Sequence, residues 1–280
     1  MSNHESSELT GQVVLVTGGG RGLGRAFAQA MAAEGAAVAV TARSADQLEE
    51  TVRLIEDSGG RAIAIPGDVS DKGAVQSAVS ATEEQLGPVD LLVNNAGVSG
   101  HNGPAWEVDL DEWKRVIEVN LFGPFLYTRA VLPGMVARRR GRIINISSGA
   151  GWRPAPYGSE YGASKAALTH MTNTIAREVD EYGISVLAYS PGFVLTAMAD
   201  SVLSPNAHAF VREKFNKIVE DGQVVPMERT VEKFMFLASG RADGLSGCLI
   251  SVADDEADLL RRAEEIRRDD LYTVRLRTQL

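Results

Sequence analysis

A run of glycines near the start of the chain constrains the fold more than any other feature. It follows an apolar, β-branched stretch at residues 12–17 that has the composition of a buried strand, and it reads Thr17-Gly18-Gly19-Gly20-Arg21-Gly22-Leu23-Gly24. Apolar residues at helical spacing come next, as far as Gly35. Glycines let a backbone approach a phosphate closely, and a helix N-terminus attracts anions. A glycine turn in this place predicts a nucleotide site.

The rest of the chain alternates between short apolar runs and helical patterns. Strands are predicted at residues 12–17, 38–41, 61–65, 89–93, 142–147, 185–190 and 245–252, with helices between them at 22–34, 44–55, 69–86, 110–137 and 161–182. Such alternation implies parallel strands, right-handed crossovers and helices on both faces. We therefore predict a single α/β domain built on a doubly wound, Rossmann-type parallel sheet of about seven strands. Its ligand should bind at the carboxyl ends of the strands.

Local signals refine this outline. Ser44 is expected to cap the second helix, and Pro124 and Pro133 are expected to interrupt or bend the helix at 110–137. Residues 1–253 should form the dinucleotide-binding and catalytic domain, with a mobile substrate lid at about 194–225. Residues 254–280 read as an extension: a helix over 257–268 with an acidic start, then a tail over 271–276 that alternates like a strand or an extended arm. The extension is expected either to pack on a neighbouring subunit or to be a frayed end.

Composition limits the partners. The net charge of -9 argues against nucleic acid, whose phosphates require a basic surface. Cys248 is the only cysteine, so no intrachain disulfide is possible, and no spacing of cysteine and histidine resembles a metal site. The polar, acidic N-terminus does not look like a signal peptide, and no apolar run is long enough to cross a bilayer. We predict a soluble, cytoplasmic protein with no metal and no membrane partner.

Polar residues that can carry chemistry follow several of the predicted strands. Of the six tyrosines, only Tyr161 has a lysine four residues further on, at Lys165, and the two would share one face of a helix. Ser148 follows the fifth predicted strand, thirteen residues before Tyr161. The remaining candidates are Asn94-Asn95-Ala96-Gly97 after the fourth strand, Asn120 in the next helix, and Pro191-Gly192 with Thr196 after the sixth strand.

These segments, in this order, resemble the short-chain dehydrogenase/reductase family, including its 3-oxoacyl-ACP reductase-like members. The wider glycine spacing of the first turn, Ser148, and the segment Tyr161-Gly162-Ala163-Ser164-Lys165 carry the resemblance, which covers roughly residues 10 to 200. It implies an NAD(P)(H)-dependent oxidoreductase that interconverts a secondary alcohol and a ketone by hydride transfer. It also implies a small-molecule substrate and a homodimer or homotetramer. The C-terminal extension departs from the pattern and puts the usual tetramer in doubt.

The resemblance also assigns roles to four side chains. Tyr161 would be the acid/base, and Ser148 would hold the substrate oxygen through a dipole that the fold sets in advance. A phenol with a pKa of ~10 is a poor base near neutrality, so a nearby ammonium, that of Lys165, is expected to favour phenolate. Lys165 would also hydrogen-bond the nicotinamide ribose, and Asn120 would anchor a water that links Lys165 to solvent. A structural role for Asn120, as a cap at the Pro124 bend, is the alternative.

The cofactor is expected to be NADP(H), with NAD(H) possible. NAD-specific folds of this kind place a carboxylate at the end of the second strand, where this chain has Val40-Thr41-Ala42-Arg43-Ser44. The Arg43 guanidinium suits a 2′-phosphate, although it could be a solvated loop residue. Asp68 matches the family position beside the adenine. The full predicted contact set is Gly18, Gly20, Arg21, Gly22, Leu23, Gly24, Arg43, Asp68, Val69, Asn95, Ala96, Gly97, Tyr161, Lys165, Pro191, Gly192, Val194 and Thr196.

Substrate identity should depend on the loops around residues 99–102, 149–160 and 193–223. Trp152, Tyr157, Phe193 and Met198 predict an apolar wall, and His101 and Arg153 are candidates for a polar contact. Two other functions stay open at this point. One is an NAD-dependent dehydrogenase of a sugar, polyol or steroid. The other is a non-catalytic NADP(H)-sensing protein, which is disfavoured because the serine, tyrosine and lysine are all present.

Overall fold

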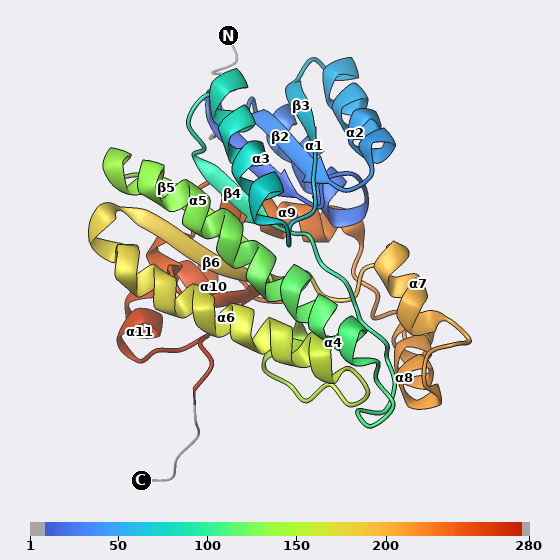
Figure 1. Ribbon diagram of the computed structural model, residues 1–280. Helices are drawn as coiled ribbons and strands as arrows, with labels where there is room; N and C mark the ends of the chain where they lie inside the picture. Colours follow the sequence, from blue (N-terminus) through green and yellow to red (C-terminus); the bar gives the residue numbers. More distant parts are fainter. Residues whose placement is uncertain (1–8, 276–280) are drawn as a thin grey trace.

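A seven-stranded parallel sheet forms the centre of the computed structural model, which describes residues 9–275 (Figure 1). The strands are β1 (Val13–Thr17), β2 (Ala37–Ala42), β3 (Arg61–Pro66), β4 (Leu91–Asn94), β5 (Gly141–Ile146), β6 (Ile184–Ser190) and β7 (Leu249–Ser251). Their order in the sheet is β3-β2-β1-β4-β5-β6-β7, so the direction of winding reverses between β1 and β4. In open α/β sheets, ligands bind at the carboxyl ends of the strands beside such a reversal. The predicted fold class is confirmed.

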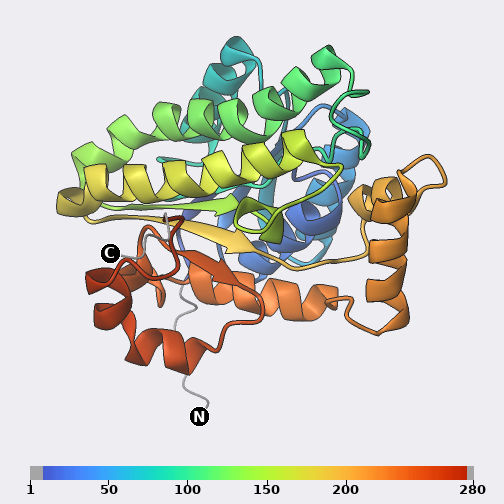
Figure 2. The same cartoon turned by 90° about the horizontal axis from the view of Figure 1, so that it is seen from below.

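Helices cover both faces of this sheet, as the alternation predicted (Figure 2). One face packs against α1 (Gly22–Ala33), α2 (Ala45–Asp57) and α9 (Met227–Ala238), with Phe27 and Phe234 stacked at 3.9 Å between ring centroids. The other face packs against α3 (Lys72–Gln85), α5 (Gly123–Arg138) and α6 (Ser159–Val179). Neighbouring residues of β1 point to opposite layers, with Val14 and Val16 on the first face and Leu15 on the second. This explains why the strand is apolar throughout.

The long helix predicted at 110–137 is divided just before Pro124, as predicted, but not at Pro133. It consists of α4 (Leu110–Ile117), a π-helical turn over Glu118–Phe122, and α5. Pro124 occupies the first turn of α5, where a missing N–H costs nothing. Pro133 lies inside α5 without ending it, so the expected interruption there is wrong. The break is instead the π-turn around Asn120, and such turns are frequent at functional sites.

Several predicted boundaries also shift. The third helix begins at Lys72 rather than residue 69, because the Asp71 carboxylate caps it by accepting from the Ala74 N–H at 2.7 Å. Ser44 is the N-cap residue of α2, but its hydroxyl makes no capping bond. The seventh strand is only Leu249–Ser251, since residues 243–245 form a 3₁₀ turn. None of the helices within residues 9–275 is both long and apolar enough to cross a membrane.

The C-terminal extension packs on its own chain. The single helix predicted at 257–268 is two, α10 (Glu256–Arg261) and α11 (Ala263–Arg268), and their Leu259 and Ile266 are buried in the core of the first face. Lys233 of α9 pairs with Glu256 at 3.0 Å. The tail forms no strand over 271–275, although the Leu249 N–H donates to the Tyr272 carbonyl at 2.8 Å and so covers part of the β7 edge. Residue 276 lies outside the described residues.

Candidate active site

The first glycine turn is joined to the end of β4 by hydrogen bonds. Thr17, at the end of β1, accepts the N–H groups of Asn95 and Ala96 on its hydroxyl, both at 3.0 Å. The Asn95 amide donates to the carbonyls of Thr17 at 2.8 Å and Gly18 at 3.2 Å. The two loops that border the reversal point of the sheet therefore form one rigid unit. Asn94 has a separate structural role, because its side-chain amide donates to the buried Oδ1 atom of Asn145 at 2.8 Å.

Two glycines of the turn are required by close packing. Gly18 has φ +64°, and a Cβ atom there would lie 2.8 Å from the Asn95 Nδ2 atom. A Cβ atom on Gly24 would lie only 2.2 Å from the Gly18 carbonyl oxygen. The first turn of α1 is thus pressed against the preceding loop, and its N-terminal N–H groups face the end of the sheet. This arrangement fits the pyrophosphate of a dinucleotide, which needs bare backbone and a helix N-terminus.

Basic and acidic side chains lie on either side of this turn. Arg21 is the N-cap residue of α1, and both Arg21 and Arg43 have exposed side chains. The Asp68 carboxylate accepts from the Ser70 N–H at 2.9 Å and from the Ser70 hydroxyl at 2.6 Å. Burial raises the pKa of Asp68, but the Ser70 hydrogen bonds and the charges of Arg43 and Arg115 outweigh it and leave that pKa lowered. Arg43 and Asp68 thus belong to one electrostatic neighbourhood.

The remaining predicted cofactor residues have mixed surroundings. Leu23 is half-buried in α1. Val69 is buried against α5, and its Cγ2 atom would lie 3.0 Å from a Cβ atom on Gly123. Thr196 is the N-cap residue of α7 (Ala197–Leu203), and its methyl group lies 3.6 Å from the Cβ position of Gly22. The segment after β6 therefore comes back to the glycine turn. Pro191 and Val194 are buried, and Gly192, at φ +77°, packs against Val225 and Val252.

Ser148, Tyr161 and Lys165 come together at the carboxyl end of β5. Tyr161 and Lys165 lie one turn apart near the start of α6, with the Lys165 ammonium 5.8 Å from the centre of the Tyr161 ring. The buried ammonium donates to the Ile146 carbonyl at 2.8 Å. The Ser148 hydroxyl lies close enough to the Tyr161 phenol to lower the pKa of the phenol. The pair predicted from the sequence thus shares one site with the predicted serine.

The ionisation of this group differs from the expectation. Burial raises the pKa of the Tyr161 phenol, and the Ser148 hydroxyl only partly opposes it, so the expected net lowering does not occur in the chain alone. The ammonium of Lys165 donates its hydrogen bond to the Ile146 carbonyl and not to the phenol. Burial also lowers the pKa of Lys165 to about 8. At neutral pH the phenol is therefore protonated and ready to donate, and the amine is mostly charged.

Asn120 connects the π-turn to both neighbouring loops. Its side chain is fully buried, accepts from the Val98 N–H at 2.8 Å, and donates to the Val98 carbonyl at 2.9 Å and to the Ser164 hydroxyl at 3.2 Å. A Cβ atom on Gly97 would lie 3.3 Å from Asn120 Oδ1 and 3.7 Å from Lys165 Nζ. Gly97 therefore leaves a space that both polar groups border. The alternative role of Asn120, as a cap at Pro124, does not fit these partners.

Three residues of this site were missed in the sequence. Thr17 and Ser164 supply the hydroxyls described above, and Glu160 is a carboxylate only 1% exposed, next to Tyr161. Glu160 accepts from the His101 N–H at 2.8 Å and from the Ser159 hydroxyl at 3.1 Å. A Cβ atom on Gly100 would lie 2.2 Å from the same carboxylate. The one signal in the sequence was a carboxylate in the first turn of α6, and that position ordinarily means a solvated residue at a helix N-terminus.

Apolar side chains surround the mouth of the site. Trp152 is 41% exposed, Met198 is 39% exposed and Leu195 is 56% exposed. The Phe193 and Phe215 rings lie 4.8 Å apart, and a Cβ atom on Gly97 would meet the Met198 methyl group at 3.8 Å. Exposed apolar side chains at a site with few polar groups are typical of a pocket for a small organic molecule. Arg153 lies over the Trp152 ring, 5.8 Å from its centroid.

Comparison with known proteins identifies the family. The profile described as short chain dehydrogenase matches residues 12–207, well over half of the chain. The chain belongs to the short-chain dehydrogenase family. A short chain dehydrogenase of Pseudocercospora fijiensis is 36% identical over 284 residues, which cover 96% of this chain and 90% of that protein. The members are oxidoreductases that act on alcohols and ketones with NAD(P)(H), and so is this chain.

Two further relatives show the range of this short-chain dehydrogenase's neighbours. A 3-oxoacyl-[acyl-carrier-protein] reductase of Synechocystis is 40% identical over 195 residues, covering 69% of this chain and 78% of that protein. A solved structure of an actinorhodin polyketide ketoreductase variant with NADPH superposes with a TM-score of 0.80 at 33% identity, covering 88% of this chain and 97% of that one. Both names describe reductions of a keto group.

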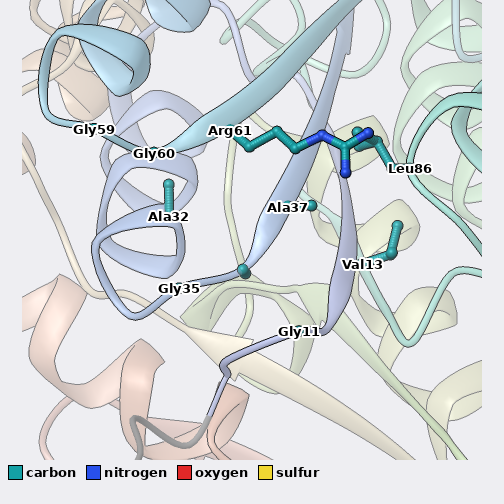
Figure 3. A pocket seen from close by; sticks show the side chains of 10 residues that line it. Gly11, Val13, Ala32, Gly35, Ala37, Gly59, Gly60, Arg61 and Leu86 are labelled. Atoms are coloured by element: carbon teal, nitrogen blue, oxygen red, sulfur yellow. The ribbon is translucent and has the colours of Figure 1, made fainter.

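Other parts of the molecule offer less to a ligand. Figure 3 shows a pocket at the amino ends of β1, β2 and β3, lined by several glycines, Val13, Ala37 and the stem of Arg61. It lies at the amino end of the strands, whereas Ser148 and Tyr161 lie at the carboxyl end, and α/β folds rarely have an active site at the amino end. Within residues 9–275, no group of three or more histidine, cysteine, aspartate or glutamate side chains could hold a metal ion.

Proposed function

We propose that this short-chain dehydrogenase interconverts a ketone and a secondary alcohol with Tyr161 as the proton donor and acceptor. The observation that carries the proposal is that Tyr161 has two polar neighbours, the Ser148 hydroxyl, which lowers the pKa of its phenol, and the Lys165 ammonium, 5.8 Å from the centre of its ring. Two neighbouring hydroxyls can both bond to one carbonyl oxygen placed between them. The Ser148 hydroxyl orients that oxygen, and the Tyr161 phenol delivers the proton.

The cofactor, when bound, supplies or removes the hydride. In the reduction, the chain contributes an oxygen-binding pair and a source of protons. Ser148 donates to the substrate oxygen as negative charge develops there, and Tyr161 transfers its proton to the same oxygen. The positive charge of Lys165 then favours the phenolate that remains. In the oxidation the same groups act in reverse, so that Tyr161 must first be deprotonated.

Proton supply follows from the position of Asn120. The Asn120 and Lys165 polar atoms border the space beside Gly97, at 3.3 Å and 3.7 Å from its Cβ position. A water held there would accept from the ammonium and donate to the amide oxygen, which already accepts from the Val98 N–H. We propose that Asn120 is the anchor of this water and that protons reach Lys165 through it. The support is that Asn120 is buried and has fixed partners on two loops.

The preferred cofactor in our proposal is NADP(H). The support is the exposed guanidinium of Arg43 at the end of β2, with Arg21 at the N-terminus of α1. We expect Arg43→Ala to weaken NADPH binding by roughly tenfold, because a hydrogen bond to a charged phosphate is lost, and to leave NADH binding within twofold. Fluorescence titration of the parent and the variant with each nucleotide measures this.

The same titration includes a control variant and can contradict the proposed preference for NADP(H). Arg53→Ala is the control. It removes another exposed arginine, which belongs to α2 and pairs with Glu50 at 2.9 Å, and it should leave the affinities for NADPH and NADH unchanged. If Arg43→Ala leaves the ratio of NADPH to NADH affinity unchanged, Arg43 is a solvated loop residue and the preference has no basis. If the parent binds NADH more tightly than NADPH, the result favours the alternative of an NAD-dependent sugar, polyol or steroid dehydrogenase.

We also propose that the chain works as a homo-oligomer. The support is a set of exposed apolar side chains on the outer side of α4 and α5, with Phe122 46% exposed, Phe125 41% exposed and Trp113 36% exposed. The centroids of the Phe122 and Phe125 rings are 6.5 Å apart, so the two side chains form a contiguous apolar patch. Sedimentation should give a dimer or tetramer for the parent and a smaller species for Phe122→Ser with Phe125→Ser. A monomeric parent at micromolar concentration would overturn the proposal.

A further inference from the structure

Two residues with positive φ contact the same residue, His208, beside the active site. Of the described residues other than glycine, five have positive φ, and two of these are Asn102 at 57° and Tyr157 at 65°. Asn102 is in the loop that follows β4, and Tyr157 is in the loop between Ser148 and Tyr161. Such backbone is unfavourable for a bulky residue and persists only where its surroundings hold it in place, commonly at clamps and switches. The residue that both of them contact is His208.

His208 joins the two loops through different groups. Its backbone N–H donates to the Asn102 carbonyl at 3.1 Å. Its imidazole lies flat on the Tyr157 ring, with 3.8 Å between centroids and 13° between planes, and Phe210 adds an edge contact to Tyr157 at 5.4 Å. The positive φ of Tyr157 and the stacking of its ring on His208 thus occur at the same residue.

His208 also begins the second helix of the lid. It is the N-cap residue of α8 (Ala209–Glu220), and its Nδ1 atom accepts from the Phe210 N–H at 3.3 Å. In both views α7 and α8 project beyond the carboxyl end of the sheet (Figures 1 and 2). A second link joins this pair of helices to the loop after β4, through the hydroxyls of Ser99 and Ser201 at 2.8 Å.

The loop that His208 holds is in turn fixed to the catalytic helix. The buried Glu160 carboxylate accepts from the His101 N–H at 2.8 Å, one residue before Asn102. Tyr157 lies four residues before Tyr161. A continuous set of contacts therefore runs from the lid to two positions just before Tyr161, namely Tyr157 and Glu160.

We propose that His208 is a positioning residue that latches residues 197–220 over the active site, and that the lid opens when its ring leaves Tyr157. The inference rests on the proposed function for the presence of a substrate under the lid. It follows that the latch selects substrates by size, because a ketone with a bulky substituent keeps the rings apart. Small ketones allow the latch to close over them.

Hydrogen–deuterium exchange and kinetics test the latch together. Loss of a stacked ring pair should change the ratio of closed to open lid by roughly two- to tenfold. His208→Ala should therefore raise amide exchange in residues 197–220 by this factor. It should raise KM for a small ketone by the same factor and leave kcat within twofold of the parent value. The ratio of kcat/KM for a bulky ketone to that for a small one should increase. His208→Phe keeps a flat ring and should restore all of these values.

Further variants separate the latch from a general loss of folding. Tyr157→Gly removes the partner ring but suits φ 65°, so it should match His208→Ala without loss of thermal stability. His170→Ala, at an exposed position of α6, is the matched control and should change nothing. Unaltered exchange in both His208→Ala and Tyr157→Gly would overturn the latch. So would a fall in kcat at constant KM. Exchange needs no substrate, so increased exchange with no turnover of any ketone refutes the proposed function and leaves the latch supported.

Discussion

Tyr161→Phe is expected to lower kcat/KM for ketone reduction by about a hundred- to ten-thousandfold, the usual range for loss of a general acid. The ring still fits, because only the hydroxyl beside Ser148 is removed. NADPH affinity should change by less than about threefold, since the loss is one hydrogen bond at most. The measurement is the decrease in reduced-nicotinamide absorbance with a panel of ketones, beside a titration of NADPH binding.

A matched control is Tyr182→Phe, which removes the same hydroxyl from the 3₁₀ turn after α6, where Tyr182 lies against the Arg139 guanidinium. It should keep full activity. Undiminished turnover in Tyr161→Phe would remove the proposed proton donor. A parent that binds NADPH but reduces no ketone or aldehyde would instead favour the non-catalytic, nucleotide-sensing alternative.

The pH profile of the parent provides a second measurement of the same residue. Burial raises the pKa of Tyr161, so the phenol is the proton donor throughout the neutral range and reduction requires no prior ionisation. Burial lowers the pKa of Lys165 to about 8, so its positive charge is present below that pH and is lost above it. Reduction should be constant up to about pH 8 and then fall. Oxidation requires the phenolate and should increase with pH.

The layout of the fold could be predicted because its signals are local. Each strand is a short apolar run, and each helix shows apolar periodicity, so the alternation and the place of the glycine turn followed from the sequence. The contact between Thr17 and the loop after β4 is consistent with that layout, since both lie at the reversal point of the sheet. The grouping of Ser148, Tyr161 and Lys165 could likewise be predicted, because their order and spacing resemble a known family and place them at one end of the sheet.

What could not be predicted depends on contacts between distant segments. The π-turn at Asn120 exists because its amide bonds to Val98 and Ser164, which are 22 and 44 residues away. Pro124 indicated a break close to this turn but not its π-helical form, and Pro133 indicated a break that does not occur. The burial of Glu160 depends on the approach of Gly100 from another loop. The raised pKa of Tyr161 has the same kind of origin, because burial is a property of the packed site and not of the sequence near it.

A single methyl group at Gly24 is expected to weaken NADPH binding by about a hundredfold, the upper end of what overpacking costs. Gly24 lies inside α1, where helix propensity alone would favour alanine by about 1 kcal/mol. The Cβ atom, however, would lie 2.2 Å from the Gly18 carbonyl oxygen and 2.5 Å from Asn95 Nδ2. Backbone must therefore move, and the part that moves is the turn on which we place the pyrophosphate.

Gly134→Ala is the matched control for this substitution. It also replaces a helical glycine, but the nearest atom to its Cβ would be the flexible end of Arg138, at 3.0 Å. Gly134→Ala should raise thermal stability and leave NADPH binding unchanged, whereas Gly24→Ala should lose NADPH binding while circular dichroism still reports a folded chain. If Gly24→Ala bound NADPH as the parent does, the close contact between α1 and the glycine turn would not be what shapes the nucleotide site. The nucleotide would then have to be placed elsewhere on the carboxyl end of the sheet.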